Sequence, residues 1–128
     1  MLSQARASEF ADRIRKGPDL NLMLPERKAA HKARQSWLTI ANDHQVPPPG
    51  DWWSIWLLLA GRGAGKTRAA AEWLWWEAWT HPKTRWLVSA PTSSDVRDVC
   101  FEGDSGLIKV IPDQLIDHYT RSLHEIYL

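Results

Sequence analysis

The stretch WLLLAGRGAGKTRAAAEW, from Trp56 to Trp73, contains the features that decide the fold. Apolar residues run from Ile55 to Ala60 and then give way to three closely spaced glycines, a lysine and a threonine. A short apolar run bounded by turn residues is typical of a buried parallel strand. The alanine-rich residues from Thr67 to about Thr80 predict a helix that ends before Pro82. A strand, a glycine-rich loop and a helix in this order predict a phosphate-binding loop.

The loop carries the residue types that a nucleotide's phosphates need. Glycines allow successive backbone N–H groups to form a concave anion site, because a Cβ there would block the phosphates. The N-terminus of the following helix adds partial positive charge. We expect Lys66 to reach the β- and γ-phosphates and the Thr67 hydroxyl to ligate Mg²⁺. The strict motif begins with glycine, whereas this chain has Ala60 at that position and Gly61 one place later.

The chain divides into three predicted parts. Residues 1–44 form a helical N-terminal arm, with apolar residues at helical spacing in 4–16 and 25–41. Residues 45–51 form a proline-rich connector, because three consecutive prolines permit no regular helix. Residues 52–128 then alternate between strand and helix patterns, which implies an α/β sheet.

Four further elements are predicted after Pro82. Residues 85–92 read as a second short buried strand. Thr92 and Asp95 are spaced as a capping box for a helix that continues to about Phe101. After a turn at 102–106, residues 107–119 are predicted to be helical with a break at Pro112, and 123–128 alternate like a strand.

Composition sets limits on the function. The 128 residues carry a net charge of +1, so charge alone indicates no nucleic-acid partner. The single cysteine, Cys100, excludes an internal disulfide framework, and no apolar stretch is long enough for a membrane span or a signal peptide. We therefore expect a soluble protein of the cytoplasm. Nine tryptophans are unusual, and four of them, at 73, 75, 76 and 79, fall in the alanine-rich helix, which should be buried on more than one side.

Two other site types are excluded. The run GDSG at 103–106 matches the surroundings of the nucleophile in chymotrypsin-like proteases, but that fold needs two β-barrels with an upstream His and Asp. Ser105 is therefore interpreted as a turn residue. The five histidines and Cys100 show no metal-ligand spacing.

With the loop placed, the chain resembles the large subunit of tailed-phage terminases, in the branch shared with prophages and gene transfer agents. The resemblance covers about residues 45–128 and rests on three segments. They read QVPPPGDWWSIWLLLAGRGAGKTRAAAEWLW, VSAPTSSDVRDVCFEGDSGL and RSLHEIYL. This family implies a P-loop NTPase fold that binds ATP and Mg²⁺. It also implies double-stranded DNA, a portal protein and a small terminase subunit as partners, and a ring oligomer for the intact protein in the cytoplasm of a bacterial host.

The resemblance also implies roles for individual residues. The triphosphate would be wrapped by the loop residues Gly61, Arg62, Gly63, Ala64 and Gly65. Arg62 stands where terminases often carry an arginine that senses or stabilises the γ-phosphate, so Arg62 and Lys66 are the candidate catalytic residues. Gln45 resembles the glutamine that contacts adenine in this superfamily. The segment 89–92 resembles one that can lie near nucleic acid in helicase-like motors.

The chain departs from the family's pattern in one respect. A motor ATPase needs a Walker B strand with an Asp for Mg²⁺ and a Glu to activate water, and no four apolar residues here precede two acids. The expected protein is therefore an N-terminal ATP-binding fragment of a DNA-packaging motor, with an incomplete parallel sheet and without Walker B or the nuclease domain. In such a sheet the Walker B strand lies between the strands at 55–60 and 85–92. Without it, the apolar edges of these two strands and nearby tryptophans should be exposed.

Three alternatives stay open at this stage. One is a fragment of a helicase-like P-loop translocase, because GKT followed by APT also suits that class. Another is a non-catalytic, truncated prophage remnant that only binds partners. A small P-loop kinase is the third, although the arginines after Arg85 are few for a substrate-phosphate site.

Overall fold

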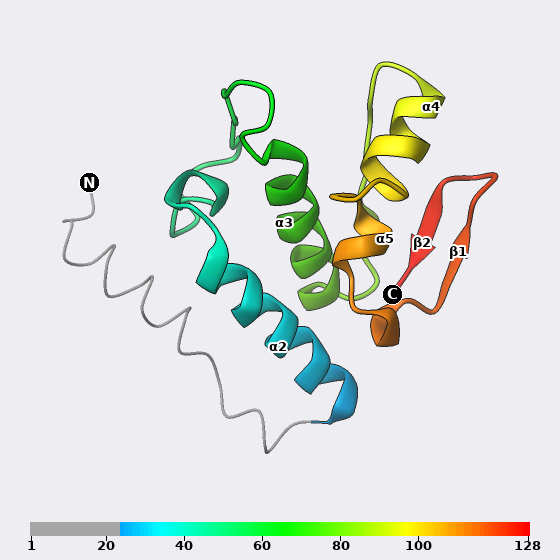
Figure 1. The fold of residues 1–128 in the computed structure, drawn as a ribbon. Coiled ribbons are helices and arrows are strands. Elements are labelled where there is room, and N and C mark those ends of the chain that lie inside the picture. The colour runs from blue at the N-terminus through cyan, green and yellow to red at the C-terminus, as the bar shows by residue number, and fades with distance from the viewer. Residues whose placement is uncertain (1–23) are drawn as a thin grey trace.

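The computed structural model describes residues 24–128, in which three helical regions lie side by side and a small hairpin lies at one edge (Figure 1). The predicted helix at 4–16 lies outside the described residues. In chain order the elements are α2 (Pro25–Ile40), η2 (Asp43–Gln45), α3 (Lys66–Thr80), α4 (Ser93–Asp95), η3 (Val96–Phe101), α5 (Leu107–Val110), η4 (Asp113–Leu115), β1 (His118–Thr120) and β2 (Glu125–Tyr127). Within these residues no helix has the length and apolar character that crossing a bilayer requires.

Helix α2 confirms the predicted helix at 25–41. Pro25 occupies the first turn, where its missing N–H costs no helical hydrogen bond, and Glu26 is acidic at the positive end of the helix. The helix buries Ala30, Trp37 and Leu38 on one face. Its charged residues Glu26, Arg27, Lys28 and Lys32 are exposed, whereas Arg34 lies on the packed side, so α2 is an amphipathic helix with one charged residue against α3.

Helix α3 confirms the helix predicted from Thr67 to about Thr80 and begins at Lys66, directly after the glycine-rich loop. Its fully buried positions are Ala69, Ala71, Glu72 and Trp75. The other three tryptophans of the helix are half-buried. The helix therefore packs on more than one side, as its composition predicts, because α2 contacts one flank and α5 and η3 contact another.

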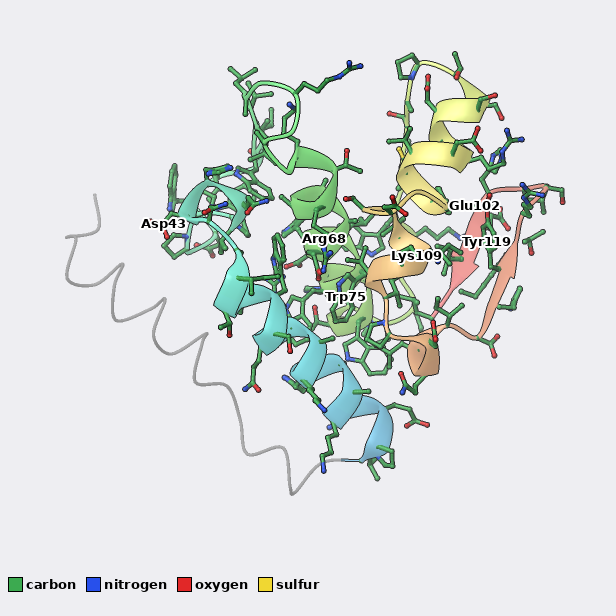
Figure 2. All side chains as sticks on the ribbon, in the orientation of Figure 1. Asp43, Arg68, Trp75, Glu102, Lys109 and Tyr119 are labelled. Carbon is green, nitrogen blue, oxygen red and sulfur yellow. The ribbon has the colours of Figure 1, made fainter. Side chains whose placement is uncertain are left out.

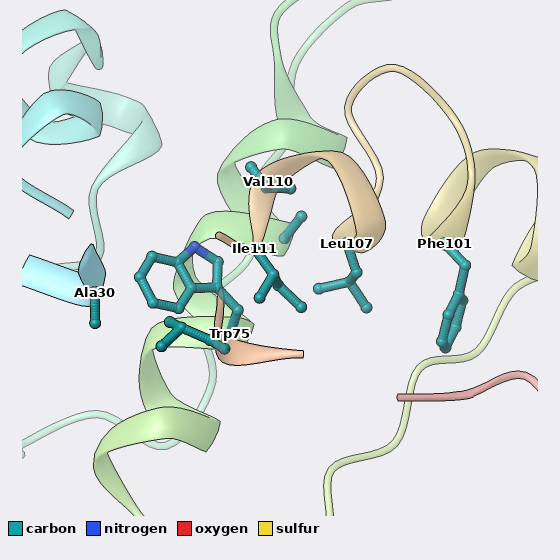
Figure 3. Close-up of a cluster of buried hydrophobic side chains, with 8 residues drawn as sticks. Ala30, Trp75, Phe101, Leu107, Val110 and Ile111 are labelled. Carbon is teal, nitrogen blue, oxygen red and sulfur yellow. The ribbon is translucent and has the colours of Figure 1, made fainter. Parts of the chain in front are cut away.

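The main core lies where α3 meets α2 and the segment 101–115. Figure 3 shows Trp75 beside Ala30 of α2, with Phe101 and the α5 side chains on the other side. Trp75 is the largest fully buried side chain of the described residues. The other core members are Ala71, Leu107, Val110, Ile111 and Leu115. A second, smaller cluster joins Trp37, Leu38 and Ala69.

The helix predicted after Thr92 forms, and its start is capped as expected. The Thr92 hydroxyl accepts a hydrogen bond from the Asp95 N–H at 3.1 Å and donates one to the Asp95 carboxylate at 2.8 Å. After Asp95 the chain widens into a π-helix, closed by a bond from the Glu102 N–H to the Arg97 carbonyl. The predicted turn follows, with the Gly106 N–H bonded to the Gly103 carbonyl at 2.8 Å.

The helical region predicted over 107–119, with a break at Pro112, is confirmed up to Val110 and wrong near its end, where a strand forms. Helix α5 ends at Val110, Pro112 begins a separate 3-10 turn, and His118–Thr120 is a strand. Proline lacks the N–H that a helix interior needs, so the break extends further than predicted. The predicted strand near the C-terminus is confirmed as β2, which pairs with β1 as an antiparallel hairpin with Tyr119 opposite Ile126.

The two predicted buried strands at 55–60 and 85–92 are not formed. Both segments are extended, but the only sheet in the described residues is the β1–β2 hairpin. Ile55, Leu57 and Leu59 are 83%, 69% and 84% exposed, whereas Trp56 and Leu58 pack against the smaller cluster. Leu87 is 90% exposed. A strand needs a neighbour for its backbone hydrogen bonds, and these segments have none. Apolar side chains of both segments are therefore left exposed to solvent.

We expect amide hydrogen exchange to separate these segments from the core. No backbone–backbone hydrogen bond of residues 24–128 involves an N–H of 55–60 or 85–90. Their amides should exchange at nearly unprotected rates, while the central turns of α3 are protected, because helical amides exchange only on opening. Exchange followed by mass spectrometry measures this directly. Strong protection over 55–60 would show that the segment pairs with another strand in solution.

The burial of Trp75 predicts the main stability determinant. Trp75→Ala should lower the free energy of unfolding by about 3–5 kcal/mol, because it leaves a large cavity at the centre of the core. Leu87→Ala removes a side chain that is almost fully exposed, and it should change the free energy of unfolding by less than about 0.5 kcal/mol. Urea denaturation followed by circular dichroism measures both. Equal effects of the two substitutions would contradict this description of the core.

Candidate functional site

The glycine-rich loop lies at the N-terminus of α3, projecting from the helices (Figure 1). Gly63 and Gly65 have φ angles of +81° and +78°, in the left-handed region that other residues rarely adopt. A Cβ added at Gly61 or Gly63 would meet no atom within 4 Å, so the loop surface is open there. Two of the three loop glycines are therefore required by the backbone itself.

Several backbone donors of the loop have no partner in the described part of the chain. The only loop N–H with a backbone acceptor is that of Ala64, which bonds to the Gly61 carbonyl at 3.4 Å. The N–H groups of Gly63, Gly65, Lys66 and Thr67 make no hydrogen bond within residues 24–128. At a helix N-terminus such donors are free to bind an anion.

Lys66, the first residue of α3, folds back over the loop. Its Nζ donates to the Ala60 carbonyl at 2.6 Å and to the Gly61 carbonyl at 2.8 Å. Both acceptors are neutral, so the ammonium charge has no ion-pair partner among the described residues. The lysine therefore brings an unneutralised positive charge to the free N–H groups of the loop.

The other two predicted loop residues are exposed. Arg62 is at the tip of the loop and makes no hydrogen bond or ion pair with any described residue. Thr67 lies in the first turn of α3 with its side chain open to solvent. The Arg62 guanidinium and the Thr67 hydroxyl are thus available to a ligand. No described residue holds either side chain in place by a hydrogen bond.

The structure places Gln45 directly against the loop. This residue, predicted to be a nucleotide contact, is only 8% exposed, and its Nε2 donates to the Gly65 carbonyl at 3.2 Å. A Cβ added at Gly65 would overlap the same nitrogen. His44 makes a second contact, with its Nε2 3.3 Å from the Ala64 carbonyl. The turn η2 therefore packs behind the C-terminal end of the loop.

Asn42 is a residue of this site that the sequence interpretation missed. Its backbone N–H and its Nδ2 both donate to Oε1 of Gln45, at 3.0 and 3.1 Å. The signal was present in the sequence, because an Asn followed three residues later by a Gln is the spacing of a capping box. The predicted boundary between the helical arm, 1–44, and the connector, 45–51, separates Asn42 from Gln45, whereas the structure joins them in one turn.

Behind the loop, a buried carboxylate anchors the first turns of α3. Glu72 is 3% exposed, and its carboxylate accepts hydrogen bonds from Arg68 at 2.9 Å and from the Trp75 indole at 2.8 Å. Arg68 also lies over the Trp37 ring of α2, 5.2 Å from its centroid. Figure 2 shows Arg68 between the two helices. This network fixes the helix that carries Lys66 and Thr67.

Arg34 of α2 adds a second link to the same region. Its guanidinium donates to the Glu72 carbonyl at 3.4 Å and lies 5.5 Å from the centroid of the Trp76 ring. Burial lowers the pKa of Arg34, and the nearby carboxylates of Glu72 and Glu77 oppose that shift. Arginine remains charged despite such a shift, so this contact does not change with pH in the physiological range.

Among residues 24–128, those outside the loop form no second group of unpaired donors with a cation beside it. Near the hairpin, Glu102 accepts hydrogen bonds from Tyr119 at 3.2 Å and from Arg121 at 2.8 Å, which ties β1 to η3. Burial raises the pKa of the Cys100 thiol, which disfavours the reactive thiolate. Within residues 24–128 no three His, Cys, Asp or Glu side chains gather as a metal site would require.

The loop therefore fits a phosphate group on structural grounds. It combines open space at two glycines, four unpaired N–H groups, an unneutralised lysine and the N-terminus of a 15-residue helix. Anions are stabilised at such a helix end by the aligned peptide dipoles and by the free donors.

The segment that contains this loop matches one known protein family. The family model described as "Terminase large subunit, T4likevirus-type, N-terminal" matches residues 57–125, just over half of the chain. The match includes the whole loop and α3, whereas Gln45 and α2 lie outside it. No curated protein and no solved structure matches the chain.

The backbone of the loop makes a prediction about its glycines. Gly65→Ala should lower the free energy of unfolding by at least about 1–2 kcal/mol, because alanine disfavours a positive φ and its Cβ would overlap the Gln45 amide. Gly61→Ala has space and no positive φ, so its effect should stay within about 0.5 kcal/mol. Urea denaturation compares the two variants. A fully stable Gly65→Ala protein would show that the loop does not hold this conformation in solution.

Proposed function

This chain belongs to the family of the large subunits of phage DNA-packaging terminases, and we propose that its glycine-rich loop binds ATP with Mg²⁺. The observation that carries the proposal is the group of unpaired N–H donors between Gly63 and Thr67, at the N-terminus of α3. Together with Lys66 they form the donor set that a chain of phosphates requires.

Each loop side chain has a proposed role. Lys66 leaves the Ala60 and Gly61 carbonyls and donates to the β- and γ-phosphates. The Thr67 hydroxyl is a ligand of Mg²⁺, which when bound neutralises charge on the phosphates. Arg62, exposed at the loop tip, can approach the γ-phosphate, where a further cation stabilises developing charge.

We further propose that 55–60 and 85–90 are strands of a P-loop NTPase sheet that is completed by other strands. Two observations support this. The side chains of 55–59 alternate between exposed and packed, as in a strand. Trp73 of α3 makes edge-to-face contacts with Trp56 and with Trp86, with 6.4 and 5.9 Å between the ring centroids. Both segments therefore lie against the same helix. The strands between them would come from polypeptide outside the 128 residues.

The remaining steps belong to the intact packaging protein. We propose that ATP bound at this loop is hydrolysed there with the help of a Walker B strand, and that hydrolysis drives double-stranded DNA into a procapsid. The partners in this proposal are the portal protein, the small terminase subunit and other large subunits in a ring. DNA packaging would then take place in the cytoplasm of the host. The 128-residue chain by itself should bind ATP and hydrolyse little of it.

Ligand-induced stabilisation tests the binding proposal. With Mg·ATP at about 100 times its dissociation constant, the free energy of unfolding should rise by about 2.7 kcal/mol. Lys66→Ala should abolish the increase, because the phosphates lose their main cation. Lys109→Ala is a matched control, since Lys109 is exposed on α5 away from the loop (Figure 2). Thermal unfolding with and without the ligand provides the measurement.

The outcomes of this experiment are distinct. An increase that is lost only in Lys66→Ala supports a working phosphate loop. A cooperative transition that does not respond to Mg·ATP would contradict the proposal and favour a chain that only binds partner subunits. An equal response in both lysine variants would move the nucleotide site away from Lys66.

A further inference from the structure

We propose that Asn42 and Gln45 form a brace that positions the phosphate loop, and that Gln45 acts through the Gly65 carbonyl rather than by contact with a nucleotide base. This inference rests on the proposed function of the loop and assigns what the site recognises. In this proposal the loop recognises the phosphates of its ligand. The base of the ligand therefore contributes little to the binding free energy through Gln45.

The first argument is that the Gln45 amide is already committed to protein partners. Its Oε1 accepts two hydrogen bonds from Asn42, and its Nε2 donates to the Gly65 carbonyl at 3.2 Å. The residue is 8% exposed. To pair with a base through both ends of the amide, Gln45 would need its Oε1, which already accepts two hydrogen bonds from Asn42 in a nearly buried position, and each unmade bond there is costly.

The second argument concerns the carbonyl that Gln45 holds. The Gly65 carbonyl also accepts the first helical bond of α3, from the Ala69 N–H at 3.0 Å. Gln45 therefore bonds to the peptide unit that joins the loop to the helix. This peptide unit joins the left-handed Gly65 to Lys66, so its orientation sets the direction of the Lys66 N–H, one of the unpaired donors of the loop.

Asn42 decides which way the Gln45 amide faces. A glutamine amide has a donor end and an acceptor end, and only its nitrogen can bond to a carbonyl. Both Asn42 groups that contact it are donors, so they hold the oxygen on their side and leave the nitrogen for Gly65. Asn42 is thus a positioning residue that acts through Gln45.

The brace connects the loop to α2. Helix α2 ends at Ile40, two residues before Asn42, and its last buried residues, Trp37 and Leu38, pack against Ala69 of α3. His44, in the same turn, adds the contact with the Ala64 carbonyl. The loop is therefore held from the side of α2 in a conformation that is ready for phosphate, which reduces the ordering cost of binding.

The test compares two ligands that share phosphates and differ in the base. Affinities of the 128-residue chain for Mg·ATP and for magnesium tripolyphosphate are measured by titration calorimetry. In Gln45→Ala and Asn42→Ala, both affinities should fall by about fivefold, with their ratio unchanged, since Gln45→Ala removes all three hydrogen bonds of the brace and Asn42→Ala removes the one from Nδ2. Asp43→Glu, an exposed residue of the same turn with its charge retained, should leave both affinities unchanged.

Two further variants separate the brace from a general loss of structure. The double variant Asn42→Ala/Gln45→Ala should bind no more weakly than Gln45→Ala alone, because Asn42 acts through the glutamine. Gln45→Met keeps the length of the side chain and should fold with an unchanged helix content, yet it should show the same loss for both ligands.

Three results would overturn the inference. If Gln45→Ala weakens ATP and leaves tripolyphosphate unchanged, Gln45 reads the base. If the variants bind both ligands as well as the wild type does, the brace has no role in binding. If the wild type binds neither ligand, the proposed function fails together with the brace, which distinguishes that failure from the other two.

Discussion

The buried carboxylate of Glu72 is the constraint on which the arrangement of the two long helices depends. A charge at 3% exposure is tolerated only when its oxygens are hydrogen-bonded, and here Arg68 and the Trp75 indole supply the donors. The same Arg68 stacks on Trp37, while Arg34 reaches the Glu72 carbonyl from α2. The polar contacts thus specify how α3 lies on α2, and the apolar core around Trp75 supplies most of the burial.

The position of the glycine-rich loop follows from this packing. Because the first turns of α3 are fixed, Lys66 and Thr67 begin the helix at one place, and the loop before them must close with left-handed glycines. The turn after α2 reaches the same place from the other side, through Gln45 and His44. Two segments that are 20 residues apart in sequence therefore meet at the peptide units that would face a phosphate.

The exposed apolar side chains are the other consequence. Ile55, Leu57 and Leu59 lie on one side of an extended segment with no strand beside it, and Leu87 is similarly open. Apolar surface of this kind is a liability in water unless another element covers it. The proposed completion of a sheet explains why the segments retain a strand-like alternation while making no strand hydrogen bonds.

Much of the fold could be predicted from local pattern. The bounds of α2 and α3 follow from apolar periodicity, Pro25 and the glycines, and the Thr92 cap follows from its spacing to Asp95. The predictions that fail depend on partners. A strand at 55–60 needs a neighbour, and the helix predicted to continue after Pro112 gives way to a strand, because residues 118–120 pair with 125–127.

The same division holds for the candidate site. The sequence by itself determined the loop and its lysine, because glycine, lysine and threonine are the residue types whose local chemistry a phosphate requires, and they are contiguous. It also named Gln45, although only by resemblance. Only the tertiary structure decided what Gln45 touches, that Asn42 orients it and that Lys66 rests on the Ala60 and Gly61 carbonyls. Contacts with residues distant in the chain depend on how α2 packs on α3, and no local pattern encodes that packing.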